Sequence, residues 1–182
     1  MRRGLVLILL VLASLSTACS ANPVSSIEAE TTKLTNSPVK NPKLVLGDTA
    51  TTTEDGNTLT VLSYESSLSV EDAKPEPGYE FSVIEVEGCA GSSSGEDLMH
   101  IGPVAFTLRL SEDGSRVHPV VFDDEDATVK EPALHTTDPP PGSCNRGFVT
   151  FQVPQGAKPN LVVFEEEFVL DEPVAWKVPS DQ

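Results

Sequence analysis

The chain has 182 residues, with 28 Asp and Glu against 12 Lys and Arg, and its formal net charge is −16 at pH 7. So acidic a protein repels nucleic-acid phosphates and anionic membrane surfaces, which excludes nucleic acids from its expected partners. The length accommodates one ordinary domain together with extensions.

The first 18 residues have the pattern of a signal peptide. Arg2 and Arg3 give a positive start, and an apolar run follows over residues 4–15. A transmembrane helix needs about 20 apolar residues, so this run is too short to span a bilayer but suits the core of a signal peptide. Removal of residues 1–18 takes away two arginines and no acidic residue, which lowers the net charge from −16 to −18.

A single cysteine, Cys19, follows the signal segment. The small residues Ser16, Thr17 and Ala18 precede it, as in the lipobox of bacterial lipoproteins, in which the cysteine receives a diacylglyceryl group. Leu15 lies one position upstream of the leucine in the usual motif. Two acyl chains suffice for stable anchoring, so we expect lipid on Cys19 to hold the protein on the extracytoplasmic face of the cell membrane. The alternative is an ordinary cleavable signal peptide with a cysteine nearby by chance.

Residues 19–42 have the composition of a tether. They are rich in Ser, Thr, Asn and Pro and contain few large apolar residues. Such a segment buries too little apolar surface to fold, so we expect a disordered, lipidated linker. Its expected role is to hold a folded domain, residues 43–180, clear of the membrane.

The other two cysteines are expected to form a disulfide. An odd number of cysteines in an exported protein leaves one thiol unexplained. If Cys19 carries lipid, Cys89 and Cys144 remain as a pair. A disulfide between them would persist in the oxidising compartment that a signal peptide implies.

The region after residue 43 reads as an all-β domain. Short β-branched runs are separated by Gly, Pro and Asp turns, and no window shows a sustained helical pattern. Such spacing predicts an immunoglobulin-like antiparallel β-sandwich of about 7–9 strands. The expected strands cover residues 58–66, 79–89, 104–110, 116–122, 144–154, 160–170 and 174–180.

Side-chain alternation assigns faces to two of these runs. In residues 58–66, Leu59, Val61 and Ser63 share one face, and Tyr64 falls on the other. The run at residues 79–89 is apolar on both faces, which is typical of a central strand covered on both sides.

A hairpin is expected in the middle of the domain. Residues 104–110 alternate, with Val104 on the apolar face, and residues 116–122 form a second apolar run. Asp113 and Gly114 between them provide the turn.

The ordered set of turns and strands resembles a known family. Its marks are Gly47 with Asp48, Gly78 before a long strand, the Asp-Gly hairpin, and an Arg-Gly-x-Val-x-Phe-x-Val-Pro strand at residues 146–154. Over residues 43–178 the chain resembles the telokin-like, immunoglobulin-fold domain of unknown function on bacterial, often actinobacterial, surface lipoproteins, a fold also seen in small secreted mycobacterial antigens. The resemblance implies no known catalytic residue and no cofactor. Cys89 departs from the family, which usually has a short polar residue such as Asn there.

The sequence contains two acidic runs. Asp123, Asp124, Glu125 and Asp126 have the oxygen ligands that calcium prefers, but the spacing of an EF-hand is absent, so a solvated loop is the favoured interpretation. The run of glutamates at residues 165–167 is expected on an edge strand, where charge discourages pairing with another sheet.

Catalytic and copper sites are not expected. Met99 and His100 are ligand types that suit copper, but the only other methionine is Met1, in the signal segment. His118 is expected on the surface. No Gly-x-Ser-x-Gly nucleophile motif is present. We therefore expect neither an enzyme nor a bound cofactor.

The disulfide would bring two loops to one end of the sandwich. These loops, residues 89–100 and 135–144, are the expected contact surface because binding residues commonly lie on loops of a rigid scaffold. The proline-rich stretch in the second loop favours polyproline II, either as a recognition segment or, as we prefer, as a stiff loop that positions Cys144. The candidate contact residues are Ser92, Ser93, Asp97, His100, Pro140 and Asn145.

The sequence thus favours a noncatalytic module on an exported, lipid-anchored protein, which binds a protein or another component of the cell envelope. The alternative is a lipoprotein that binds a metal or small ligand and delivers it to a transporter.

Overall fold

A computed structural model describes residues 44–51, 56–69, 73–92, 101–120, 122, 129–165 and 173–180. All of them belong to one compact unit, residues 37–182. The expected signal peptide, Cys19 and the tether lie outside the described residues. Within the described ranges, no helix has both the length and the apolar character needed to cross a membrane.

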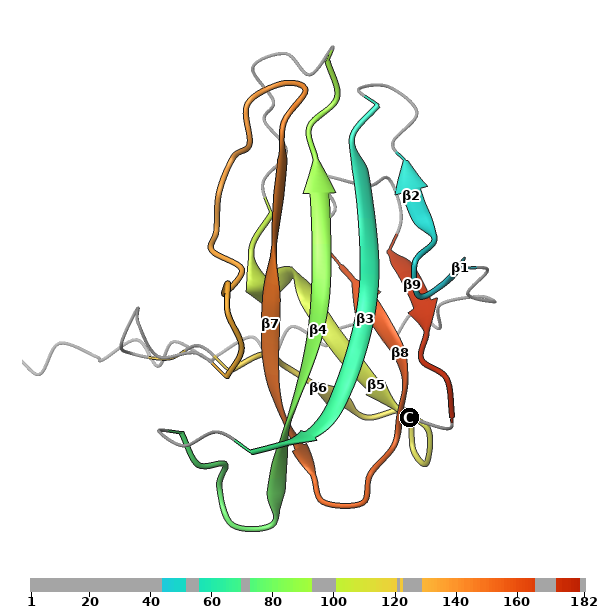
Figure 1. Ribbon diagram of the computed structural model, residues 1–182. Helices are drawn as coiled ribbons and strands as arrows, with labels where there is room; N and C mark the ends of the chain where they lie inside the picture. The colour runs from blue at the N-terminus through green and yellow to red at the C-terminus, as the bar shows by residue number, and fades with distance from the viewer. Residues whose placement is uncertain are drawn as a thin grey trace, which may run out of the picture. The chain divides into compact units, whose positions relative to one another are not determined.

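The domain is a β-sandwich of two sheets (Figure 1). One sheet has the strand order β1-β9-β8-β5-β6 and the other the order β2-β3-β4-β7. Strand pairs are antiparallel except β1 with β9. The strands are β1 Leu44–Val45, β2 Thr49–Thr51, β3 Thr58–Leu68, β4 Tyr79–Cys89, β5 Phe106–Leu110, β6 Arg116–Val117, β7 Cys144–Pro154, β8 Pro159–Phe164 and β9 Val174–Lys177. The predicted fold class is confirmed.

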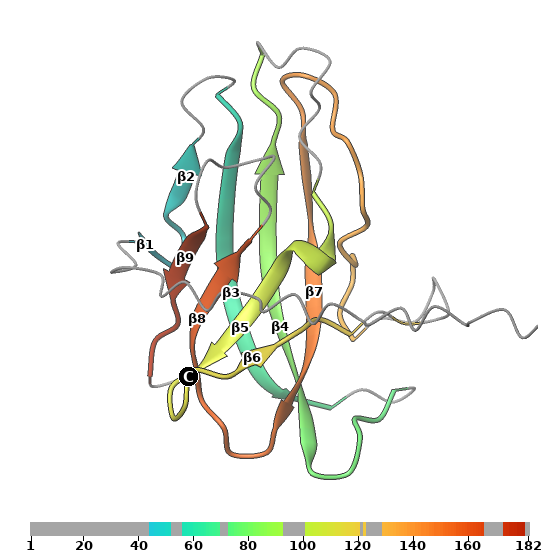
Figure 2. The same cartoon turned by 180° about the vertical axis from the view of Figure 1, so that it is seen from behind.

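A single apolar core fills the space between the sheets. Figure 2 shows the five-stranded sheet in front of the four-stranded one, so that side chains from β5, β8 and β9 face those of β3, β4 and β7. The largest fully buried side chains include Trp176, Phe106, Phe151, Phe164, Leu59, Ile84 and Leu108. Burial of this apolar surface is the main favourable contribution to folding.

The central strand is β4, as predicted. It pairs along its whole length with β7 and over most of it with β3. Ile84 and Val86 face the core, whereas Phe81 and Val83 lie on the opposite face and are still buried. There the ring of Phe81 packs against the ring of Phe122, with 6.4 Å between centroids.

The predicted faces of β3 are wrong beyond Val61. The pairing with β4 shifts between Val61 and Ser63, so an extra residue is inserted into the strand. Such a β-bulge reverses the side-chain alternation downstream. Tyr64 therefore joins Leu59 in the core, and Ser63 is only half-buried.

The predicted hairpin exists, but its strands are shorter than expected. Val104 lies in a 3-10 helix, Pro103–Ala105, with 68% of its surface exposed, so β5 begins only at Phe106. The second strand ends at Val117. Pro119 then bridges to Phe151, and the amide of Val120 donates to the carbonyl of Thr150 (2.9 Å). The chain leaves one sheet and runs along the edge of the other.

The glutamate run was predicted to lie on an edge strand, and this prediction is wrong. The strand that leads into the run is β8, which lies between β9 and β5. Glu165 follows β8 directly, whereas the next two glutamates lie outside the described residues. Its carboxylate accepts from Arg109 (3.2 Å) and Arg116 (3.0 Å), which face each other across β5 and β6. Glu165 thus offsets the repulsion between two half-buried arginines.

Candidate functional site

The predicted disulfide joins the end of β4 to the start of β7. Cys89 and Cys144 are direct partners in the strand register, and the structure connects them by a disulfide. The end of β4 and the start of β7 lie toward the upper end of the sandwich in Figure 1. We call this region, Cys89–Ser92 together with residues 135–145, the disulfide end.

Backbone hydrogen bonds hold the two loops together beside the disulfide. The amide of Ala90 donates to the carbonyl of Ser143 (2.9 Å), and the amide of Gly142 donates to the carbonyl of Ala90 (2.9 Å). Gly142 has φ = +77°, a conformation that favours glycine. The amide of Gly91 donates to Oδ1 of Asn57 (2.8 Å), which fastens the first loop to the start of β3.

The proline-rich loop is held along its length. Thr137 and Ile101 exchange two backbone hydrogen bonds (3.1 and 3.2 Å). Pro140 accepts from the amide and the hydroxyl of Ser143 (2.9 and 2.7 Å). These contacts agree with the interpretation of the segment as a stiff loop that positions Cys144.

Only some of the candidate contact residues can be placed. Ser92 and Pro140 are exposed, and Asn145 is half-buried, with its amide Nδ2 donating to the carbonyl of His135 (3.3 Å). Outside the described residues lie the remaining candidates, together with Met99 and the acidic run: Ser93, Asp97, His100, Asp123, Asp124, Glu125 and Asp126.

The described parts of the chain gather no group of three His, Cys, Asp or Glu side chains that could hold a metal ion. His118 is exposed, as expected, and so is His135.

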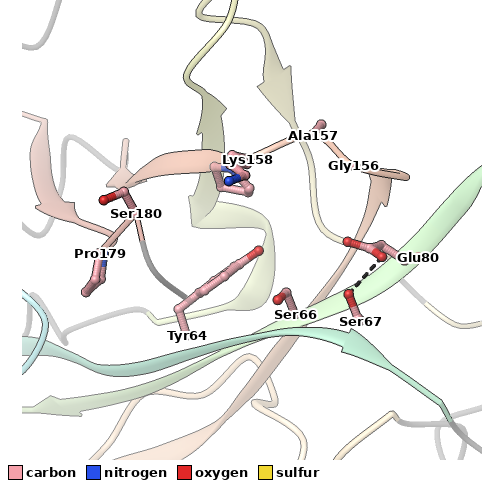
Figure 3. Close-up of a pocket in the computed structure, with 10 residues that line it drawn as sticks. Tyr64, Ser66, Ser67, Glu80, Gly156, Ala157, Lys158, Pro179 and Ser180 are labelled. Atoms are coloured by element: carbon pink, nitrogen blue, oxygen red, sulfur yellow. Dashed lines mark hydrogen bonds between the residues drawn. The ribbon is translucent and has the colours of Figure 1, made fainter.

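A pocket of about 180 Å³ lies at the opposite end of the sandwich (Figure 3). Glu80, at the start of β4, lines this pocket, and Cys89 ends the same strand. The walls come from β3, β4, the turn between β7 and β8, the start of β8, and the segment after β9. The lining residues are Tyr64, Ser66, Ser67, Glu80, Gly156, Ala157, Lys158, Pro159, Pro179 and Ser180. We call it the Tyr64 pocket.

An irregularity in β3 shapes one wall of this pocket. The register with β4 shifts between Glu65 and Leu68, and Ser67 has φ = +56°, a conformation uncommon for any residue except glycine. The hydroxyl of Ser67 donates to Oε2 of Glu80 (2.9 Å), which fixes the carboxylate at the pocket wall.

Tyr64 links the pocket to the core. Its hydroxyl donates to Oγ of Ser82 (3.2 Å), a side chain with no exposed surface. Burial raises the pKa of the Tyr64 phenol, and the charge of Glu80 adds to this, whereas the hydroxyls of Ser82 and Ser66 oppose it. The phenol is therefore neutral at physiological pH.

No signal in the sequence pointed to the Tyr64 pocket. Its residues come from separate segments, and the wrong face prediction for Tyr64 placed that side chain outside the core. Gly156, with φ = +80° in the turn before β8, predicts a turn there but not a pocket.

No family model matches the chain, and no curated protein matches its sequence. Three solved structures are similar in fold. The protein ycdA of Bacillus subtilis, described as a candidate lipoprotein, has a TM-score of 0.52 and 13% identity. The similarity covers 74% of this chain but 39% of ycdA, so the chain spans about two fifths of that protein.

The other two structures match over nearly their whole length. MPT63, a secreted protein of Mycobacterium tuberculosis, has a TM-score of 0.51 and 18% identity over 74% of this chain and 95% of its own. The yjhA protein of B. subtilis has a TM-score of 0.51 and 17% identity over 75% and 99%. At these identities the likeness shows the fold alone. Membership of the telokin-like family stays a prediction.

Proposed function

We propose that this chain is an exported lipoprotein, anchored through Cys19, whose β-sandwich binds a protein or another envelope component without catalysis. The signal-peptide pattern and the small residues before Cys19 support export and lipidation. The disulfide supports an oxidising compartment. Two proteins of similar fold are described as a candidate lipoprotein and a secreted protein, which agrees with this location.

The disulfide end is the contact surface in this proposal. The observation that carries it is the fastening of two loops to the β4–β7 pair by the disulfide and by the paired bonds of Ala90. A loop held in one conformation loses less entropy when it binds a partner. Ser92 and Pro140 are exposed on this rigid base and are available for contact.

Binding is tested with the full-length chain as bait in an envelope extract. We expect the double variant Ser92→Arg, Pro140→Arg to lose the captured partner, because two bulky charges on the contact surface create clashes and unpaired charge. Ser69→Arg adds the same side chain at an exposed position that follows β3, near the other end. This control is expected to capture the partner as the wild type does. Equal capture by all three proteins would contradict the proposal.

Lipidation is tested separately by Cys19→Ala. We expect the wild type to partition into the detergent phase and the variant into the aqueous phase, because alanine has no thiol to acylate whereas two acyl chains anchor a protein stably. Partitioning of both proteins into detergent would rule out a lipid on Cys19.

A further inference from the structure

We propose that the Tyr64 pocket binds one sugar ring, or a group of that size with several hydroxyls. This site lies at the opposite end of β4 from the disulfide end, and the proposal does not depend on what that end binds. It rests on four features of the pocket: its charge balance, its hydroxyl groups, its size and its preformed wall.

The charges in the pocket are balanced, which disfavours a simple ion as its ligand. Lys158 and Glu80 both line it. Glu80 uses one carboxylate oxygen to accept from Ser67, and Lys158 forms no ion pair in the part of the chain that the structure describes. An ammonium group offers donors and a carboxylate offers acceptors. Together they suit a neutral ligand whose hydroxyls both donate and accept.

Hydroxyl groups and apolar ring surfaces line the same space. Ser66, Ser67 and Ser180 contribute hydroxyls, each of which is able to donate and accept. The ring of Tyr64 and the ring of Pro179 provide apolar walls (Figure 3). A sugar ring has the matching surface, with C–H faces for the apolar walls and hydroxyls around its edge for the polar groups.

The volume restricts the ligand to a small group. Pockets for drug-sized molecules usually measure about 300–1,000 Å³, whereas this one measures about 180 Å³. A single ring or the terminal unit of a longer glycan is of the appropriate size. The pocket is also open to solvent at exposed Ser180 and Lys158, so the rest of a chain has room to extend outward.

The wall of the pocket is formed before any ligand arrives. The left-handed backbone of Ser67 is unfavourable for a residue with a side chain, and such conformations gather at binding sites. The hydrogen bond from Ser67 holds the carboxylate of Glu80 in place. The hydrogen bond to buried Ser82 holds the ring of Tyr64 in place. A ligand therefore meets polar groups that are already oriented, which lowers the entropy cost of binding.

The test uses the full-length chain, purified in a detergent without a sugar headgroup, and NMR titration with glucose, galactose, mannose, arabinose and N-acetylglucosamine. We expect at least one sugar to bind with a dissociation constant of ~10 mM or tighter. The amide signals of Tyr64, Ser67 and Lys158 should shift, because these residues line the pocket. Absence of binding by every sugar at that concentration would overturn the proposal.

Matched variants locate the binding. Lys158→Ala removes a donor, and Ser180→Tyr fills the mouth of the pocket at an exposed position close to the end of the described residues. Each is expected to weaken binding at least about tenfold. Lys177→Ala removes an equal charge from an exposed lysine that does not line the pocket and should leave binding unchanged. Unchanged affinity in both pocket variants contradicts the assignment.

Two further ligands separate a sugar site from a charge-selective one. Acetate and glycine carry the charges that Lys158 and Glu80 attract but lack hydroxyl groups. We expect neither to compete with the bound sugar, and we expect the sugar affinity to be insensitive to salt, because a neutral ligand is not screened. Displacement of the sugar by either competitor at an equal concentration would show that charge rather than hydroxyl recognition selects the ligand.

Discussion

Removing the Cys89–Cys144 disulfide is expected to lower the free energy of unfolding by roughly 4 kcal/mol. The bridge joins residues separated by 55 positions, and a crosslink of that span removes much conformational entropy from the unfolded chain. The double variant Cys89→Ser, Cys144→Ser tests this without leaving an unpaired thiol. Urea denaturation followed by circular dichroism measures the loss.

Controls separate the crosslink from the substitutions. A reducing agent should lower the denaturation midpoint of the wild type and leave that of the double variant unchanged. Hydrogen exchange should accelerate most at Ala90 and Gly142, whose amides bond next to the bridge. Equal denaturation midpoints for the oxidised wild type and the double variant would show that the disulfide contributes nothing to stability.

Strands β4 and β7 were predictable because each is a long run of strand-forming residues, and the pairing between them contains no bulge. The predicted bounds of β4 and β7 match the observed ones. Each strand is 11 residues long, and each is bounded by turn residues. Gly78 turns the chain before β4 with φ = +87°, a conformation that strongly favours glycine. The disulfide followed from the cysteine count and needed no geometry.

Irregular and short elements were not predictable from the pattern. A β-bulge inserts one residue into β3 after Val61. The alternation of Leu59 and Val61 does not predict the position of this bulge. β1 and β2 have only two and three residues, too few to show a period. They form because the turn at Gly47 and Asp48 carries the chain from one sheet to the other.

The candidate sites also differ in how far they could be predicted from the sequence. The disulfide end is built from the ends of two strands that are neighbours in one sheet, and the predicted disulfide between them located it. The role of Glu165 required knowing that Arg109 and Arg116 are partners across a hairpin. The Tyr64 pocket needs the packing of both sheets, because β3 and β4 belong to one and β8 to the other.

Trp176→Ala is expected to cost about 3–5 kcal/mol of stability, because truncation of a buried large aromatic residue leaves a cavity in the core. The indole has no exposed surface and packs within the main apolar cluster. Its Nε1 also donates to the carbonyl of Asp48 (2.8 Å). The substitution therefore removes both core packing and the bond between β9 and the turn that joins the two sheets.

Trp176→Phe separates these two contributions. Phenylalanine keeps most of the apolar surface but cannot donate to Asp48, so we expect a smaller loss of about 1–2 kcal/mol. Exchange should accelerate at the amides of Val45 and Asp48, which bond within the same turn. Because Trp176 is the single tryptophan, denaturation is followed by circular dichroism rather than by fluorescence. Val104→Ala, at a side chain 68% exposed, is the control and should change stability by less than about 0.5 kcal/mol. Equal stability of Trp176→Ala and this control would mean that the indole is not part of a packed core, and the two-sheet arrangement itself would then be wrong.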